Sequence, residues 1–172
     1  PIATPTPTGA ATPTPTTVPG TEGARFMNIL NKTNGAKVAV DASGGVHMTY
    51  TDYTSLYYAY CAPNCSSISS WSTVSFNNGN SFKYVELALT TTGRPRLLIL
   101  GDDAGYSTHY WYAACDTNCS TNVANWKTNL VVNTNYTDDT LYEYSYYTFA
   151  LDPQTHPRFI YRKYMSGTAY YV

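Results

Sequence analysis

The sequence predicts an all-β fold of three tandem four-stranded antiparallel sheets, the last lacking its outer strand, behind an extended N-terminal tail. Tyrosine is unusually frequent, with 18 Tyr beside only 12% charged residues, and tyrosine favours half-buried pleated surfaces. A motif of strand, tight turn and second strand recurs three times along the chain. The strand that follows each copy is apolar or aromatic on consecutive positions, as in strands that are covered on both faces.

Residues 1–23 form a leader that differs in composition from the rest. Six of the ten prolines lie in its first 20 residues, and threonine fills half of the other positions there. Proline fixes φ, and this segment has too few large apolar groups for a core, so we expect extended polyproline II chain. Such stretches are typical of exported stalks and often carry O-linked glycans, with a plain linker as the alternative. The candidate O-glycosylation sites are Thr4, Thr6, Thr8, Thr12, Thr14, Thr16 and Thr17.

The β-repeat domain is expected over residues 24–172. It comprises an orphan strand at about 24–30, repeat one at about 37–76, repeat two at about 86–132 and partial repeat three at about 148–172. Each repeat opens with a strand, a turn and a strand, over Val38–Tyr50, Leu87–Ile99 and Phe149–Tyr161. The Asp-x-x-Gly form of the turn suits a hairpin, because Asp bonds its own backbone and Gly accepts a positive φ.

A third strand follows in every repeat, over Leu56–Cys61, Tyr110–Cys115 and Ala169–Val172. A fourth follows in the first two repeats only, beginning at Trp71 and at Trp126. The spacing between these two repeats is 54 residues at the cysteines and 55 at the tryptophans, an agreement that chance does not easily produce. Four-stranded meanders of about 40–55 residues that stack face on face describe the blades of a β-propeller or a related array.

The first turn and the strand after it, Asp41 to Tyr50, read Asp-x-x-Gly-x-(Pro/Val)-x-apolar-x-Tyr. In this pattern the chain resembles the β-propeller-type tandem repeats of bacterial exported and cell-surface proteins, over about Lys37 to Val172. The resemblance implies blade-like sheets and an extracellular or cell-surface location. The sialidase motif Ser-x-Asp-x-Gly-x-x-Trp is not present in the sequence, so no sialidase chemistry is implied.

The expected strands do not balance between the two ends of the domain. Repeat three stops at Val172, the position of Ala59 and Ala113, before any fourth strand. An assembly strand precedes repeat one where a fourth strand would sit, and it consists of Phe26, Met27, Asn28, Ile29 and Leu30. Three explanations stay open: this strand completes the last sheet of a neighbouring subunit, it closes a ring within its own chain, or the chain is a fragment of a longer propeller.

We favour completion between subunits, because propellers typically have four to eight blades and three would close with unusual geometry. Strand addition uses backbone hydrogen bonds for affinity, and a head-to-tail contact that does not close on itself produces a filament. The sequence therefore predicts a structural subunit of an extracellular self-assembling filament, with copies of itself as partners.

The four cysteines form two close pairs at equivalent positions of the first two repeats. The pairs are Cys61 with Cys65 and Cys115 with Cys119. An even count, matching positions and an exported character predict two local disulfides. A zinc site that uses all four thiolates is the alternative, but three intervening residues differ from the usual spacing of two.

Four triplets match the acceptor pattern for N-linked glycans. Their asparagines are Asn31, Asn64, Asn118 and Asn135. The second and third recur because the repeat recurs, so they count as one coincidence. Short polar loops produce such triplets often, and a chance match is the alternative reading.

Composition and motifs argue against several other classes. The formal net charge of -1 and the absence of a basic run give no case for nucleic-acid binding. No apolar stretch reaches the ~18 residues of a membrane span. His47, Arg96 and Arg158 fall on one equivalent strand position, and residues repeated by duplication are usually structural. We therefore expect no enzymatic activity, no cofactor and no metal site, since Asp102–Asp103 falls short of a calcium ligand set.

Carbohydrate binding is the second function class. Tyr and Trp rings beside Asn and Asp can stack on sugar faces, which would make the chain a lectin-like propeller-type surface domain or a fragment of one. Stacked sheets would bury the same aromatic residues, which argues for the structural role. Binding of glycans by the isolated subunit separates the two classes.

Overall fold

The structure is a computed structural model that describes residues 34–52, 54–63, 65, 67–77, 79–103, 108–133, 148–160, 162–165 and 168–171. Its regular elements are antiparallel strands and two single-turn 3-10 helices, η1 (Ile68–Ser70) and η2 (Val123–Asn125). The all-β prediction is therefore confirmed for this part of the chain. The leader and the expected assembly strand Phe26–Leu30 lie outside the described residues.

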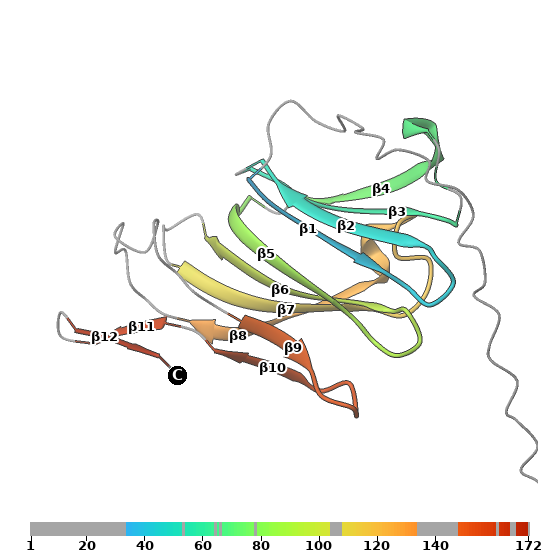
Figure 1. Ribbon diagram of the computed structural model, residues 1–172. Coiled ribbons are helices and arrows are strands. Elements are labelled where there is room, and N and C mark those ends of the chain that lie inside the picture. Colours follow the sequence, from blue (N-terminus) through green and yellow to red (C-terminus); the bar gives the residue numbers. More distant parts are fainter. Residues whose placement is uncertain are drawn as a thin grey trace, which may run out of the picture.

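The first two repeats form four-stranded antiparallel meanders, as predicted. Sheet A consists of β1 (Asn34–Val40), β2 (Val46–Thr51), β3 (Leu56–Cys61) and β4 (Trp71–Phe76), in that order. Sheet B consists of β5 (Ser81–Leu89), β6 (Pro95–Asp102), β7 (Thr108–Cys115) and β8 (Trp126–Asn133), in the same order. The two sheets lie face to face, one above the other (Figure 1).

The third repeat departs from the prediction. It consists of β9 (Thr148–Leu151), β10 (Pro157–Ile160), β11 (Arg162–Met165) and β12 (Thr168–Tyr171). Two separate two-stranded sheets form, β9 with β10 and β11 with β12, where one continuous three-stranded sheet was expected. Strands β10 and β11 together occupy the position in the repeat that the single strand β6 occupies in repeat two. β10 pairs with β9, and β11 pairs with β12.

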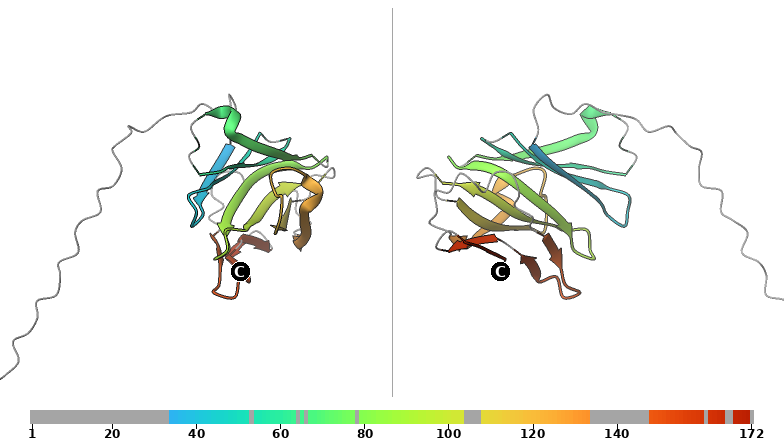
Figure 2. Two further views of the ribbon diagram at one scale, coloured as in Figure 1. Left: turned by 90° about the vertical axis from the view of Figure 1, so that its right-hand side faces the viewer. Right: turned by 60° about the vertical axis from the view of Figure 1, so that its left-hand side comes forward.

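A tighter connection explains the position of β12. Met165 pairs with Thr168 in the third repeat, whereas Asp102 pairs with Thr108 in the second. The shorter loop brings the last strand back at once, so β12 lies against the end of the preceding strand. The described sheets form an open stack and do not close into a propeller ring (Figures 1 and 2).

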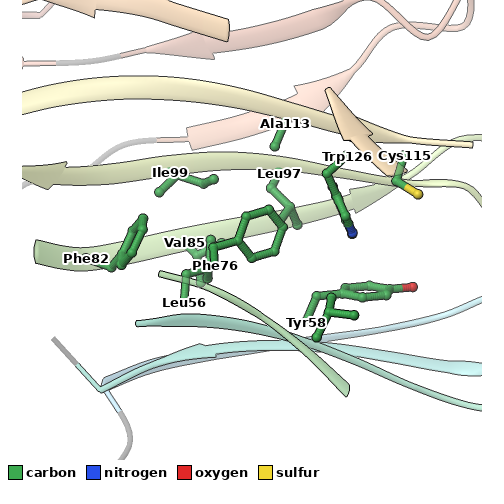
Figure 3. Close-up of a cluster of buried hydrophobic side chains, with 11 residues drawn as sticks. Leu56, Tyr58, Phe76, Phe82, Val85, Leu97, Ile99, Ala113, Cys115 and Trp126 are labelled. Atoms are coloured by element: carbon green, nitrogen blue, oxygen red, sulfur yellow. The ribbon is translucent and has the colours of Figure 1, made fainter. Parts of the chain in front are cut away.

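Sheet B is covered on both faces. On one side its side chains pack against sheet A, and Figure 3 shows Tyr58 and Phe76 of sheet A facing Leu97 and Trp126 of sheet B. On the other side Leu98 and its neighbours pack against Phe149 and Phe159 of the β9–β10 hairpin. Successive side chains of a strand point to opposite faces. The continuous apolar run Leu97–Leu100 therefore serves two cores. The third strand β7, for which the sequence predicted two covered faces, places Tyr110 in one core and Ala113 in the other.

The first strand of each repeat lies beside the first strand of the next. β1 contacts β5, and β5 contacts β9. The Lys37 ammonium lies 2.8 Å from the Glu86 carboxylate and joins β1 to β5 across this contact. The turns that end β1 and β5 are thereby brought to the same side of the stack, and the loop after β7 reaches them there.

Candidate functional site

The turn that opens each repeat has one hydrogen-bond pattern. In repeat one, Asp41 N donates to Gly45 O at 2.9 Å and Gly44 N donates to Asp41 O at 3.0 Å. The same two bonds recur from Thr90 in repeat two and from Asp152 in repeat three. The fourth position of the turn has a positive φ each time, at 89° for Gly44, 75° for Gly93 and 67° for Thr155.

The Asp41 carboxylate closes the first turn. Its Oδ1 accepts from Ser43 N at 2.8 Å, from the Ser43 hydroxyl at 2.6 Å and from Gly45 N at 2.9 Å. These donors favour the charged form of the carboxyl. The Ser43 hydroxyl is the largest cause, and together with the Gly45 N–H it holds the pKa of Asp41 well below its usual range.

His47 links that carboxylate to the core. Its Nε2 lies 3.2 Å from Asp41 Oδ2, and its Nδ1 lies 2.7 Å from the Tyr58 hydroxyl. Burial lowers the pKa of His47 and raises the pKa of Tyr58. Both groups are therefore neutral near pH 7: Tyr58 donates to Nδ1, and the Nε2–H donates to Asp41. The Tyr58 ring in turn packs edge-on against Trp126 of sheet B, at 4.9 Å between ring centroids.

Repeats two and three use the equivalent position differently. In repeat three, Arg158 donates to Asp152 Oδ2 at 2.8 Å, which reproduces the pairing of turn and strand. In repeat two, Thr90 offers no carboxylate, so Arg96 turns to Asp116 Oδ1 at 2.7 Å and to Cys115 O at 2.8 Å. The side chain at this strand position therefore binds the turn of its own repeat in repeats one and three, and the loop after β7 in repeat two.

A pocket of about 360 Å³ opens between sheets A and B at the turn side of the stack. Sheet A contributes Asp41, His47, Tyr58 and Tyr60 to its lining. The β5–β6 turn contributes Thr92, Gly93, Arg94 and Pro95, and the loop after β7 contributes Asp116, Thr117, Asn118, Cys119, Ser120 and Thr121. The wall at Gly93 is close, since a Cβ there would lie 3.1 Å from the Asp41 Cβ.

Both predicted disulfides are present, Cys61–Cys65 and Cys115–Cys119, each with 5.7 Å between Cα atoms. The second one shapes the pocket, because Cys119 O accepts from Trp126 Nε1 at 2.9 Å and so fixes the loop to β8. With both pairs bonded, the zinc alternative does not apply. The two bonds are consistent with an extracellular or other oxidising environment.

Only some of the predicted glycosylation and assembly residues belong to the part of the chain that the structure describes. Asn31, Asn64, Asn135, the candidate threonines of the leader and the assembly strand lie outside the described residues. Asn118 lies at the pocket, exposed, with a φ of 53° that asparagine tolerates better than most residues. Its backbone carbonyl accepts from the Thr121 hydroxyl at 2.9 Å.

The two carboxylates of Asp102 and Asp103 have different partners. Asp102 lies 2.6 Å from the Lys83 ammonium and accepts from the Thr108 hydroxyl at 2.8 Å, whereas Asp103 lies 3.0 Å from His109 Nε2. Both are therefore engaged in ion pairs or hydrogen bonds with protein groups. Over the described ranges no group of three or more His, Cys, Asp or Glu side chains is placed to hold a metal ion.

Sequence reasoning assigned His47 to a structural position but did not identify its partners. The signal was present, because Asp41 precedes His47 by six residues as Asp152 precedes Arg158. Arg94 and Asp116 carried no signal, since they lie far apart in the chain and meet only through the pairing of β6 with β7.

No family model, curated protein or solved structure matches this chain. In the part of the chain that the structure describes, no helix has the length and apolar character needed to cross a bilayer.

Proposed function

We propose that this chain is a structural subunit of an extracellular filament in which copies stack head to tail. The observation that carries the proposal is the exposure of Val38 at one end of the sheet stack and of Ile160 at the other. The equivalent positions pack against a neighbouring sheet wherever one repeat meets the next.

The upper end of the stack is the face of sheet A that points away from sheet B. Val38 lies on this face and is 62% exposed, as is Val40. The equivalent of Val38 in repeat two is Leu87, which packs into the core between sheets A and B. The equivalent in repeat three is Phe149, which packs against sheet B. Two repeats thus use this position to receive another sheet, and repeat one leaves it in solvent.

The lower end of the stack has the complementary feature. Ile160 of β10 is 50% exposed. Its equivalents Thr49 and Leu98 are 0% and 1% exposed, because each lies between its own sheet and the sheet below. Stacking the lower end of one copy on the upper end of another would cover Val38, Val40 and Ile160 with the kind of contact that already joins the repeats.

A contact between two different surfaces does not close within a pair and extends into a filament. The segment Phe26–Leu30 would strengthen it by pairing with the third repeat of the neighbouring copy, where, among the described strands, β12 pairs with β11 alone. The disulfides and the Thr/Pro leader support assembly outside the cell, where glycans on the leader would remain at the surface of the fibre.

The test places a charge at the proposed contact. In Val38→Lys an ammonium would be desolvated between sheets, so fibres should be lost while the monomer keeps its fold. Leu130→Lys is the matched control, because Leu130 is 52% exposed on β8, away from both ends. Negative-stain microscopy and light scattering measure assembly, and circular dichroism checks the fold. A wild-type chain that stays monomeric at high concentration, or fibres formed by Val38→Lys, would contradict the proposal.

Carbohydrate binding, the second expectation, does not compete with assembly. The pocket lies between sheets A and B at their turns, and neither Val38 nor Ile160 lines it.

A further inference from the structure

We infer that the pocket between sheets A and B binds an uncharged saccharide, one or two sugar rings in size. The inference does not rest on filament formation, because the pocket is complete within one chain. Its volume of about 360 Å³ is at the small end of the range for ligand sites, roughly 300–1,000 Å³.

Tyr60 supplies the aromatic surface that a sugar ring packs against. Its ring contacts the His47 ring, at 4.8 Å between centroids, and the Cβ of a residue in place of Gly45 would lie 2.6 Å from its hydroxyl. The side chain is thus held from behind while it lines the open pocket. An aromatic ring already in its binding orientation loses little conformational freedom when a ligand packs on it.

The polar side of the pocket is built to both donate and accept. The Asp116 carboxylate is fixed by Arg96 at 2.7 Å, and Arg94 Nη1 lies 3.7 Å from the same oxygen. A carboxylate only accepts hydrogen bonds and a guanidinium only donates them. Two neighbouring hydroxyls of a sugar can satisfy both, since each hydroxyl donates and accepts.

The charges in the pocket are already balanced, which selects against ionic ligands. The Asp41 carboxylate is occupied by Ser43, Gly45 and His47. Asp116 is countered by Arg94 and Arg96, and the pKa of Asp116 is lowered, chiefly by the Arg96 hydrogen bond. The remaining lining is rich in hydroxyl groups, from Thr92, Thr117, Ser120 and Thr121. An uncharged polyhydroxyl ligand is the class that gains most from such a surface.

The fold joins these groups from separate repeats. Tyr60 comes from sheet A, Arg94 from the β5–β6 turn, and Asp116 from the disulfide-closed loop of repeat two. The site therefore depends on the packing of one repeat on the next, which explains why no local sequence motif marks it.

Titration with methyl glycosides of glucose, galactose, mannose and N-acetylglucosamine, followed by protein NMR, tests the inference. At a glycoside concentration of about 50 mM, which suits the weak binding of a single sugar ring, at least one glycoside should shift the resonances of the pocket residues. Arg94→Ala should weaken that binding by about tenfold or more, because a charge-assisted hydrogen bond is lost. Arg94 is 51% exposed, so the substitution should leave the fold intact. Arg158→Ala, which removes a 68% exposed guanidinium from repeat three, is the control and should bind normally.

A second pair of variants separates the ring from the fold. Tyr60→Phe keeps the aromatic face and should retain binding within a few-fold, whereas Tyr60→Leu should lose it by about tenfold. Equal melting temperatures of the two variants would show that the difference lies in the pocket. If no glycoside perturbs the pocket, or if Arg94→Ala binds like the wild type, the inference is overturned.

The sugar could belong to a free polysaccharide or to a glycan on another copy of the chain, and the chemistry is the same. Enzymatic removal of glycans distinguishes the two sources: it abolishes sugar-dependent association between copies in the second case and changes nothing in the first. Glycoside binding by a chain that never forms fibres would support this inference and contradict the proposed function. Fibre formation with no glycoside binding would do the reverse.

Discussion

Thr155 takes the left-handed position that glycine fills in the other two turns, with a φ of 67°. A side chain with a Cβ is strained there, by about 1–2 kcal/mol, and a β-branched residue most of all. We predict that Thr155→Gly stabilises the fold by about 1 kcal/mol, because it relieves this strain. The stabilisation is smaller than the full strain, because glycine loses more conformational freedom on folding than threonine does. Urea unfolding measures the change.

The control for this substitution is Thr91→Gly. Thr91 is exposed in the equivalent turn of repeat two and has no positive φ. Glycine there should stabilise nothing and should cost up to about 1 kcal/mol of backbone entropy. Equal effects of the two substitutions would show that the backbone at Thr155 carries no strain.

The chain from Tyr58 through His47 to Asp41 predicts loss of stability in acid. The pKa of His47 is lowered by burial and the pKa of Asp41 by its donors, so the unfolded chain takes up protons at a higher pH than the folded chain. The His47 contribution is complete above about pH 6.5 and is lost as pH falls through the lowered pKa of the folded state. Asp41 adds a further loss below about pH 4.

The free energy of unfolding should therefore fall by up to about 1.4 kcal/mol per pH unit below pH 6.5. His47→Gln removes this slope above pH 4, whereas His156→Gln, at a side chain 65% exposed, leaves it unchanged. Urea unfolding at a series of pH values measures both. A wild-type protein of constant stability between pH 7 and pH 4 would mean that the buried imidazole is not held neutral.

At the scale of single strands, the sequence predicted most of what is observed. Leu56–Cys61 was predicted as a strand and is β3. The placement of Tyr110 and Ala113 of β7 in two different cores follows from the predicted run of apolar residues, because side-chain direction along a strand is fixed locally. The split of the third repeat was not predicted, because it depends on the length of one connection and on which half of a strand each neighbour covers.

The expected strand Phe26–Leu30 yields a prediction at the same scale. If it pairs with a neighbouring copy, Ile29→Pro should abolish or strongly shorten fibres, because proline removes a ladder hydrogen bond and distorts a strand interior. Thr12→Pro in the leader is the matched control, since a polyproline II segment accepts another proline. Microscopy of the two variants compares them, and equally long fibres from both would exclude strand completion as the joining contact.

For the molecule as a whole, the sequence indicated stacking but not the surfaces involved. Three copies of one motif imply that sheets pack in series, because no single repeat can bury its own apolar faces. The sequence left closure into a ring open as one explanation, and the described sheets do not close into one. Closure depends on the small rotation between sheets, which no residue pattern encodes. The pocket was missed for the same reason: Tyr60 and Arg94 become neighbours only through that rotation.

The polarity of the proposed filament leads to a prediction that simple loss of assembly does not test. A Val38→Lys copy has a blocked upper end, but its lower end at Ile160 is unchanged. It can therefore add its lower end to the upper end of a growing wild-type fibre, and it then prevents the next copy from adding. Mixed at about one part in ten with wild type, it should shorten fibres severalfold, as expected for a head-to-tail contact. Leu130→Lys at the same ratio should leave the length unchanged. Length distributions from negative-stain images distinguish a head-to-tail contact from a contact between identical surfaces. With identical surfaces, the Val38→Lys copies would stay out of the fibres and would not shorten them.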